Sequence, residues 1–258
     1  MKIRRTSPFF LKALVLIALI TVWTVLSHFQ IWNPLIFPSP AKTLTYIFEN
    51  QIFVYESTLK TLKMLVVAFC ICSCIALSVG SVASQWKTFR KVLEVLVSII
   101  NPIPSISLLP FAILWFGLGE SPILFTTVMG SLAVFTLSIM NGFASIPPVL
   151  VDVGRIYGLG KWGMLRRIYL LAALPSILTG VKATWGISWR SLVGAELVCG
   201  AMGESRGLGW LITINRYNLN PNGMAAGILC ITVIGLLIEH GIIGVIEKKT
   251  VKKWGMKV

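Results

Sequence analysis

The segment that decides the fold runs from Val151 to Pro175 and reads Val-Asp-Val-Gly-Arg-Ile-Tyr-Gly-Leu-Gly-Lys-Trp-Gly-Met-Leu-Arg-Arg-Ile-Tyr-Leu-Leu-Ala-Ala-Leu-Pro. It is basic, it is interrupted by glycines, and it lies between two stretches that are apolar enough to cross a membrane. A membrane-spanning helix needs about 20 mostly apolar residues. About six stretches of the chain meet this requirement, namely residues 11–29, 62–83, 92–116, 123–140, 170–198 and 224–246.

The composition agrees with a bilayer environment. Hydrophobic residues make up 56% of the 258 residues, charged residues make up 12%, and the mean hydropathy is +0.84. One soluble core of ordinary size cannot bury that much apolar surface. The sequence therefore predicts an all-α integral membrane protein, with residues 1–258 forming a single transmembrane domain. The first apolar stretch lacks a small-x-small cleavage site, which favours a retained anchor over a secretion signal.

The formal net charge of +14 is explained by membrane topology, because the basic residues lie at the ends of apolar stretches and do not form one basic face that could bind nucleic acid. Nucleic acid is not an expected partner. Lys and Arg are retained on the cytoplasmic side during insertion. Four segments are rich in them, residues 2–12, 87–91, 155–167 and 248–257, and the opposite connections carry far fewer. Both termini, and a loop at about residues 145–169, are therefore predicted to be cytoplasmic.

The loop at residues 145–169 is expected to contain a short helix that projects from the membrane. Ser145 and Pro148 mark its start, and Asp152 lies near its amino end, where the helix dipole favours an acidic side chain. Gly158 and Gly160 are expected to end it, because glycine accepts the left-handed conformation that closes a helix. Apolar and basic residues follow, expected to be exposed and to contact a partner: Lys161, Trp162, Met164, Leu165, Arg166 and Arg167.

Two other interpretations of this loop are available. Its aromatic and basic residues are also suited to lie on lipid headgroups, without a protein partner. The dipeptide Gly160-Lys161 suggests a phosphate-binding loop, but Arg155 stands where that loop needs glycine and Trp162 where it needs serine or threonine. The chain itself is therefore not expected to bind ATP.

In its acidic, glycine and aliphatic positions the loop resembles the cytoplasmic coupling loop of ATP-binding-cassette importer permeases. That pattern reads Glu-Ala-Ala, three residues, Gly, nine residues, Ile-x-Leu-Pro. Four positions of this chain correspond to it: Asp152 stands for the Glu, Gly158 matches the Gly, and Ile168 and Leu170 match the Ile and Leu. Three positions depart from it, because Val153 and Gly154 replace the alanines and Leu171 replaces the proline.

Other motifs, in the same order along the chain, are similar to the branch that imports nitrate, taurine and other sulfonates. They are Asn101-Pro102-x-Pro104, Leu114-Trp115-Phe116-Gly117-Leu118-Gly119, Ala195-Glu196, Gly207-Leu208-Gly209-Trp210-Leu211-Ile212 and Lys253-Trp254-Gly255-Met256. Each motif is weak by itself, and their order makes the set specific. The match covers most of the chain.

The resemblance implies a permease subunit of type I architecture in a bacterial cytoplasmic membrane. It implies a second copy of the chain, a pair of cytosolic ATPase subunits that bind ATP and Mg²⁺, and an extracytoplasmic substrate-binding protein, with membrane lipids around them. No cofactor or metal is expected on this chain. The residues expected to couple it to the ATPase are Asp152, Gly154, Arg155, Gly158, Trp162 and Leu165. The transported solute is expected to be small and anionic.

Polar and aromatic residues at membrane depth suggest a translocation pathway, because ionisable groups inside hydrocarbon usually face a cavity or a partner. At 100° per residue, one stripe of the fifth apolar stretch holds Lys182, Trp185, Trp189, Val193 and Glu196, and Arg190 projects about 80° from Lys182. The alternative is structural. In it Lys182 extends toward the cytoplasmic surface and Glu196 anchors neighbouring helices.

Prolines interrupt the third apolar stretch at Pro102, Pro104 and Pro110. Each removes a backbone donor, which favours a broken span that forms a pathway wall or a hinge, or else a kink that serves only packing. On the opposite side of the membrane, an amphipathic stretch at residues 41–48 predicts a short interfacial helix with Pro40 in its first turn and Ser39 as its cap.

Two rival functions are weighed against an ATP-driven importer. A secondary transporter driven by an ion gradient usually shows inverted repeats and buried carboxylates in matched halves, and neither is visible in the sequence. A membrane-embedded enzyme needs a cluster of His, Asp, Glu or Cys at one depth, whereas His28 and His240 lie in different apolar stretches.

Overall fold

The computed structural model describes residues 8–29, 32–33, 36–199 and 206–247, and within these ranges the chain is helical and has no strand. The elements are α1 (Pro8–His28), α2 (Pro40–Glu49), α3 (Gln51–Gln85), α4 (Lys87–Ile100), the 3-10 turn η1 (Ser105–Leu108), α5 (Leu109–Phe116), α6 (Glu120–Ala144), α7 (Pro148–Ile156), α8 (Lys161–Met164), the π-helical turn η2 (Leu165–Tyr169), α9 (Leu170–Ala172), α10 (Leu174–Cys199), α11 (Leu208–Tyr217), α12 (Pro221–Leu236), the π-helical turn η3 (Leu237–Ile243) and α13 (Gly244–Glu247). The prediction of an all-α membrane protein is confirmed.

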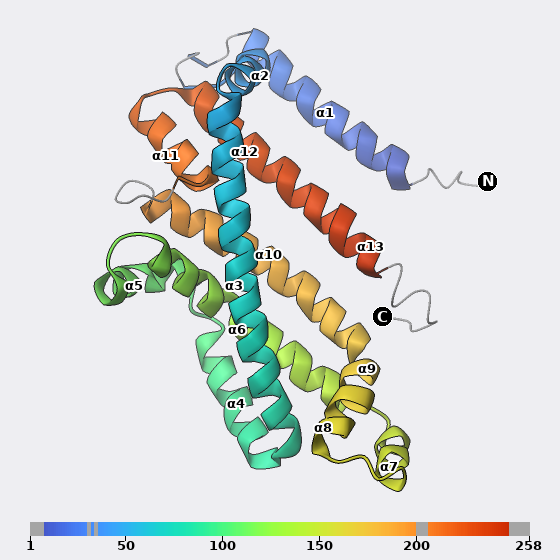
Figure 1. The fold of residues 1–258 in the computed structure, drawn as a ribbon. Coiled ribbons are helices and arrows are strands. Elements are labelled where there is room, and N and C mark those ends of the chain that lie inside the picture. The colour runs from blue at the N-terminus through green and yellow to red at the C-terminus, as the bar shows by residue number, and fades with distance from the viewer. Residues whose placement is uncertain (1–7, 30–31, 34–35, 200–205, 248–258) are drawn as a thin grey trace, which may run out of the picture.

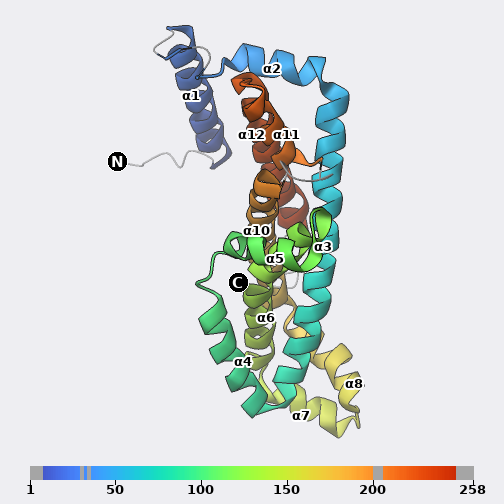
Figure 2. The same ribbon diagram turned by 90° about the vertical axis from the view of Figure 1, so that its left-hand side faces the viewer.

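The helices run between two ends of the molecule. Figure 1 shows α2 and the beginning of α12 at one end, and α7 and α8 at the other. Figure 2, a quarter turn away, shows α2 lying across the first end while the long helix α3 descends toward the second. The interfacial helix expected at residues 41–48 is therefore present. Ser39 is its N-cap residue in an extended conformation and Pro40 lies in its first turn, as predicted, although the Ser39 side chain makes no capping hydrogen bond.

The number of candidate spans is smaller than the six apolar stretches suggested. By length and composition, three segments of the described chain can cross a membrane: Gln51–Gln85, Glu120–Ala144 and Pro221–Gly241. Two bent pairs raise the number to five if each is one span, Lys87–Ile100 with Ser105–Phe116 and Lys161–Ala172 with Leu174–Cys199, and Leu14–His28 is a shorter apolar helix. Every one of the six stretches contains helix, but bending keeps two of them from being straight spans.

The third stretch is broken where its prolines predicted. The helical axis turns by 88° between α4 and the segment formed by η1 and α5. The break is packed and not open, because a Cβ atom on Gly130 of α6 would lie 2.6 Å from Cβ of Ser105. The Ser105 hydroxyl also lies 2.7 Å from the Ser191 hydroxyl of α10. The break therefore sits against both α6 and α10.

The fifth stretch bends by 69° between α8–α9 and α10. Ala173 lies at the bend, and Pro175 follows in the first turn of α10, where its missing N–H and its ring prevent a straight continuation from the preceding turn. Helix α10 then packs along α6. Gly142 and Gly180 allow this, because a Cβ on Gly142 would lie 2.9 Å from Cβ of Ser176, and one on Gly180 would lie 2.5 Å from Cβ of Ser138.

Two apolar clusters form the core. One contains Phe135, Ile139 and Phe143 of α6 with Ala173, near the end that carries α7 and α8. The other joins α3, α10 and α11 toward the opposite end, through residues that include Leu65, Leu192 and Leu208. Helices α3, α6 and α10 all contribute to both clusters, so these three helices connect the two ends of the molecule.

Candidate functional site

The segment from Pro148 to Tyr169, called the coupling segment below, is an elbow of two short helices followed by a π-helical turn. Helix α7 ends at Ile156, and Gly158 adopts the left-handed conformation with φ of 66°. The N–H of Leu159 donates to the carbonyl of Gly154 (3.0 Å), and that of Gly158 donates to the carbonyl of Arg155 (2.9 Å). These two bonds are the Schellman pattern that closes a helix on a glycine.

Three details of the expected elbow are wrong. Gly160 has φ of −66° and ψ of 171°, an ordinary extended conformation, and it precedes α8 instead of ending α7. Ser145 belongs to the end of α6, where its hydroxyl donates to the carbonyl of Gly142, while Pro147 immediately precedes α7. Asp152 is the fifth residue of α7, so it lies beyond the first turn in which the helix dipole acts most strongly.

The two helices of the elbow pack directly on each other through Gly154. Gly154 is buried, and a Cβ atom there would lie 2.5 Å from the sulfur of Met164 and 3.2 Å from Cγ1 of Ile168. Met164 was expected to be exposed, but this contact buries it. The aromatic ring of Tyr169 then meets that of Phe143 on α6, with centroids 5.8 Å apart. The elbow is therefore fixed to the body of the bundle.

The outer face of the elbow, called the docking surface below, presents large apolar side chains and charges together. The exposed fractions are 83% for Ile156, 80% for Tyr157 and 73% for Trp162. Asp152 and Arg155 are exposed beside them and form an ion pair of 3.4 Å. Leu165 is only half exposed, because it packs against the apolar cluster around Phe143, so it supports the surface instead of forming it.

A groove of about 500 Å³ lies between α10 and the α12–η3 segment, and it collects four of the five predicted pathway residues. Lys182, Trp185, Trp189 and Arg190 line it, with Glu239 on the facing element. The rings of Trp185 and Trp189 are nearly parallel, with centroids 6.3 Å apart and 13° between their planes. The groove thus combines two cations and one carboxylate with an aromatic wall.

The fifth predicted pathway residue, Glu196, lies elsewhere. Its side chain is fully buried and does not line the groove. Its carboxylate accepts hydrogen bonds from the Thr61 hydroxyl of α3 and from the N–H of Gly209 in α11. In this conformation the geometry is that of the structural alternative, in which Glu196 anchors neighbouring helices. The sequence showed no signal for Thr61, whereas the Gly207-Leu208-Gly209 motif was visible without its partner.

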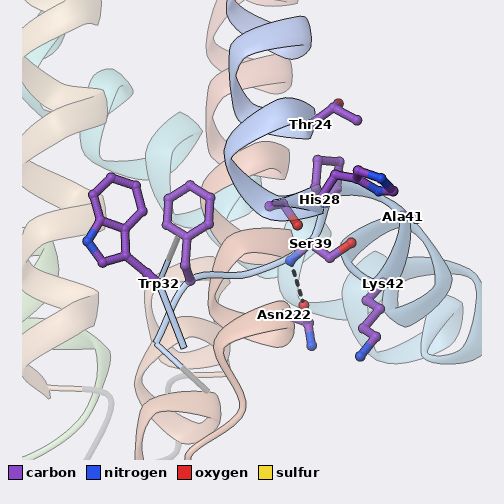
Figure 3. Close-up of a pocket in the computed structure, with 10 residues that line it drawn as sticks. Thr24, His28, Trp32, Ser39, Ala41, Lys42 and Asn222 are labelled. Atoms are coloured by element: carbon purple, nitrogen blue, oxygen red, sulfur yellow. Dashed lines mark hydrogen bonds between the residues drawn. The ribbon is translucent and has the colours of Figure 1, made fainter. Parts of the chain in front are cut away.

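A further pocket of about 330 Å³ lies at the end of the molecule opposite to the coupling segment, between the end of α1, α2 and the start of α12. Figure 3 shows its two sides joined by a hydrogen bond of 3.2 Å from the N–H of Ser39 to Oδ1 of Asn222. His28 and Lys42 contribute to its lining. None of the residues predicted for coupling or translocation does.

The apolar helices, the broken third and fifth stretches and the exposed elbow define a helical membrane protein. The chain belongs to the family of binding-protein-dependent transport system inner membrane components, whose family model matches residues 73–252. It is thus an inner-membrane permease of the ATP-binding-cassette importer class, a transport component and not an enzyme. The orientation of its two termini, predicted from the basic residues, stays a prediction.

Three relatives match over most of their length. The taurine transport system permease protein TauC of Escherichia coli is 26% identical, over 88% of this chain and 84% of its own. The putative aliphatic sulfonates transport permease protein SsuC of Bacillus subtilis is 27% identical, over 94% of this chain and 87% of its own. A putative ABC transporter permease of Methanocaldococcus jannaschii is 26% identical, over 92% and 90%.

A solved structure has the same fold. The inward-facing MetNI methionine ABC transporter contains a chain that aligns with a TM-score of 0.61 and 22% identity, over 76% of this chain and 96% of that chain. The expected type I importer permease architecture is therefore confirmed.

Proposed function

We propose that this chain works as a symmetric pair that imports a small anionic solute, such as taurine, another sulfonate or nitrate, with energy supplied by a separate cytosolic ATPase. The observation that carries the proposal is the docking surface. A membrane protein that exposes a tryptophan, a tyrosine and an isoleucine on one small elbow, among charged side chains, presents the residue types that are enriched at protein interfaces.

In the proposed cycle, ATP and Mg²⁺ bind to the two ATPase subunits and close them around the nucleotide. The closure pulls the two coupling segments together and rocks the attached helices, so that the pathway opens outward to a substrate-binding protein. Hydrolysis then resets the pair to the inward-open state. The packing of Gly154 against Met164 supports this mechanism, because a rigid elbow transmits displacement to α10 instead of absorbing it.

The groove beside α10 supports an anionic solute. A cation lowers the electrostatic barrier that an anion meets in a low-dielectric passage. Arg190 and Lys182 line the groove with the tryptophan pair, and these two cations outnumber its one carboxylate, Glu239. The names of two relatives specify taurine and aliphatic sulfonates, which agree with this charge preference. Affinity for the solute, and selection between solutes, are proposed to reside mainly in the substrate-binding protein.

Reconstitution into liposomes with the cognate ATPase and binding protein tests the proposal. Uptake of radiolabelled taurine, an alkanesulfonate or nitrate is expected to require ATP. Uptake that persists without the ATPase, and that follows an ion gradient instead, identifies a secondary transporter. Arg190→Gln is expected to slow uptake about tenfold while the ATPase stays bound. Arg216→Gln is the matched control, because Arg216 lies on α11 outside the groove, over the ring of Tyr217.

A further inference from the structure

The carboxylate of Glu196 joins three helices near the end of α10 that lies farthest from the coupling segment. The Thr61 hydroxyl of α3 lies 3.0 Å from both carboxylate oxygens, and the N–H of Gly209 donates to Oε2 at 2.9 Å. The same Thr61 oxygen accepts the N–H of Leu208 at 2.8 Å. Thr61, Glu196 and the amides of Leu208 and Gly209 therefore form a closed ring of hydrogen bonds, called the latch below.

The latch satisfies groups that would otherwise be costly to bury. Leu208 and Gly209 are the first two residues of α11, and their N–H groups have no acceptor within that helix. A carboxylate with no exposed surface is likewise unfavourable unless donors surround it. The hydrogen bonds of the latch give acceptors to the two N–H groups and donors to the Glu196 carboxylate. Removing one partner leaves a buried donor or acceptor without a hydrogen bond.

Two glycines let α11 approach closely enough for these bonds. A Cβ atom on Gly207 would lie 2.1 Å from Oε1 of Glu196. One on Gly209 would lie 2.5 Å from Cβ of Glu196 and 2.8 Å from the carbonyl oxygen of Val193, which is backbone and cannot move aside. The motif Gly-Leu-Gly therefore has a specific geometric function at this contact, and it brings the start of α11 onto α10.

The position of the latch relates it to force transmission. Glu196 lies 22 residues beyond Leu174 on a continuous helix, which at 1.5 Å per residue is about 33 Å from the bend. The coupling segment continues through α9 and meets α10 at that bend. We infer that the latch makes the far ends of α3, α10 and α11 one rigid unit, so that displacement of the coupling segment moves all three together. Glu196 is then a positioning residue for the transport cycle and not a residue that contacts the solute.

This inference rests on the proposed ATP-driven function. In a complex whose ATPase pulls on the elbow, a loose joint at the far end of α10 lets α10 move without α3 and α11. ATP is then hydrolysed although the pathway does not open outward. The quantity that the latch controls is therefore the number of ATP molecules consumed per solute imported.

The test uses Thr61→Val and Glu196→Gln, singly and together, in the complex with ATPase and binding protein in liposomes. Thr61→Val keeps the side-chain shape and removes the hydroxyl at the centre of the ring. Each single variant is expected to raise the ATP consumed per solute at least about fivefold. The double variant is expected to go no further than the stronger single variant, because residues in one network do not act additively.

Thr127→Val is the matched control. Thr127 is also fully buried, but its hydroxyl bonds only to the carbonyl of Ile123 in its own helix (2.7 Å). Its ATP consumption per solute is expected to equal that of the unmodified chain. An equal rise in Thr127→Val, or no rise in Thr61→Val, overturns the inference. If Glu196→Gln does not accumulate in the membrane, the ATP consumption per solute of Thr61→Val alone tests the inference.

Hydrogen exchange adds a readout that does not depend on transport. The amides of Leu208 and Gly209 are expected to be protected in the nucleotide-free complex and in the ATP-bound complex alike, and to exchange at least about tenfold faster in Thr61→Val. Loss of protection in only one nucleotide state of the unmodified chain overturns the rigid unit. Absence of ATP-dependent uptake by the unmodified complex overturns the proposed function instead, so the two failures are distinguishable.

Discussion

The two ends of α10 place their side chains in opposite environments. At its first residues α10 joins an elbow whose largest apolar side chains face outward, with Trp162 exposed by 73%. Near its last residues it holds Glu196, a charged residue with no exposed surface. One end thus exposes residues that are usually buried, and the other buries a residue that is usually exposed.

The difference shows where each end finds its partners. The docking surface has no complement within the described chain, so its stabilisation must come from another molecule or from lipid. The latch is complete within one chain, because each donor of the ring has its acceptor. Substitutions on the docking surface should therefore change association and leave folding intact, whereas substitutions at the latch should change folding or the transmission of movement.

The largest effect on stability is expected at Gly209. In Gly209→Ala the new methyl group overlaps Cβ of Glu196 and the backbone of α10 at the same time. The free energy of unfolding of the isolated permease is expected to fall by about 3 kcal/mol. The measurement is the temperature at which half of the detergent-solubilised protein stays monodisperse in size-exclusion chromatography.

Gly186→Ala controls for a methyl group added elsewhere on α10, at a glycine that lines the groove. The nearest atom to a Cβ at Gly186 is Nη2 of Arg190 at 3.6 Å, which is ordinary contact. Its stability is expected to change by no more than about 1 kcal/mol, and in the stabilising direction, because alanine favours helix over glycine. A Gly209→Ala protein that melts with the unmodified chain argues against the close approach of α11 to α10.

At the elbow, Trp162→Ala is expected to act on binding alone. Loss of a central aromatic anchor typically costs about 2 kcal/mol of binding free energy, which weakens affinity for the ATPase about 30-fold. Binding of the purified ATPase to immobilised permease measures this, and the melting temperature of the permease should not change. Trp115→Ala is the control, because Trp115 is similarly exposed but lies on α5, away from the docking surface.

A substitution at Gly158 tests the backbone geometry of the elbow without changing the side chains of the docking surface. Its φ of 66° costs a β-branched residue about 1–2 kcal/mol, while nothing lies within 4 Å of a Cβ there. Gly158→Val is therefore expected to lose the end of α7 and to reduce coupled uptake up to about tenfold, with membrane insertion intact. Gly160→Val has equal free space and φ of −66°, so its uptake should stay normal.

The same contrast explains what could be predicted from the sequence. The elbow was predicted because its determinants are local, with Pro148 and Gly158 bounding one short helix. The latch was not, since Thr61 and Glu196 are 135 residues apart and a single threonine at the edge of an apolar stretch carries no pattern. The break in the third stretch was predicted from its prolines, but its angle of 88° depends on packing against α6 and α10. Helix α11 was missed because its ten residues fall short of a membrane span.

The smallest effect is expected for the ion pair on the docking surface. Asp152 and Arg155 are exposed by 63% and 72% and lie 3.4 Å apart, so Asp152→Asn should change the free energy of unfolding by less than about 0.5 kcal/mol. Association with the ATPase should slow about threefold and become less sensitive to salt, because a charge at the rim of an interface acts mainly on the encounter rate.

Glu94→Gln is the matched control for this charge. It breaks the ion pair with Arg90 on α4 (2.7 Å), which likewise joins neighbouring turns of one helix but lies outside the docking surface. Its association rate should equal that of the unmodified chain. Equal slowing in both variants means that the ATPase senses the overall charge of the permease and not the elbow. A large loss of stability in Asp152→Asn alone means that the ion pair supports the fold of α7, which would remove the distinction between the two ends of α10.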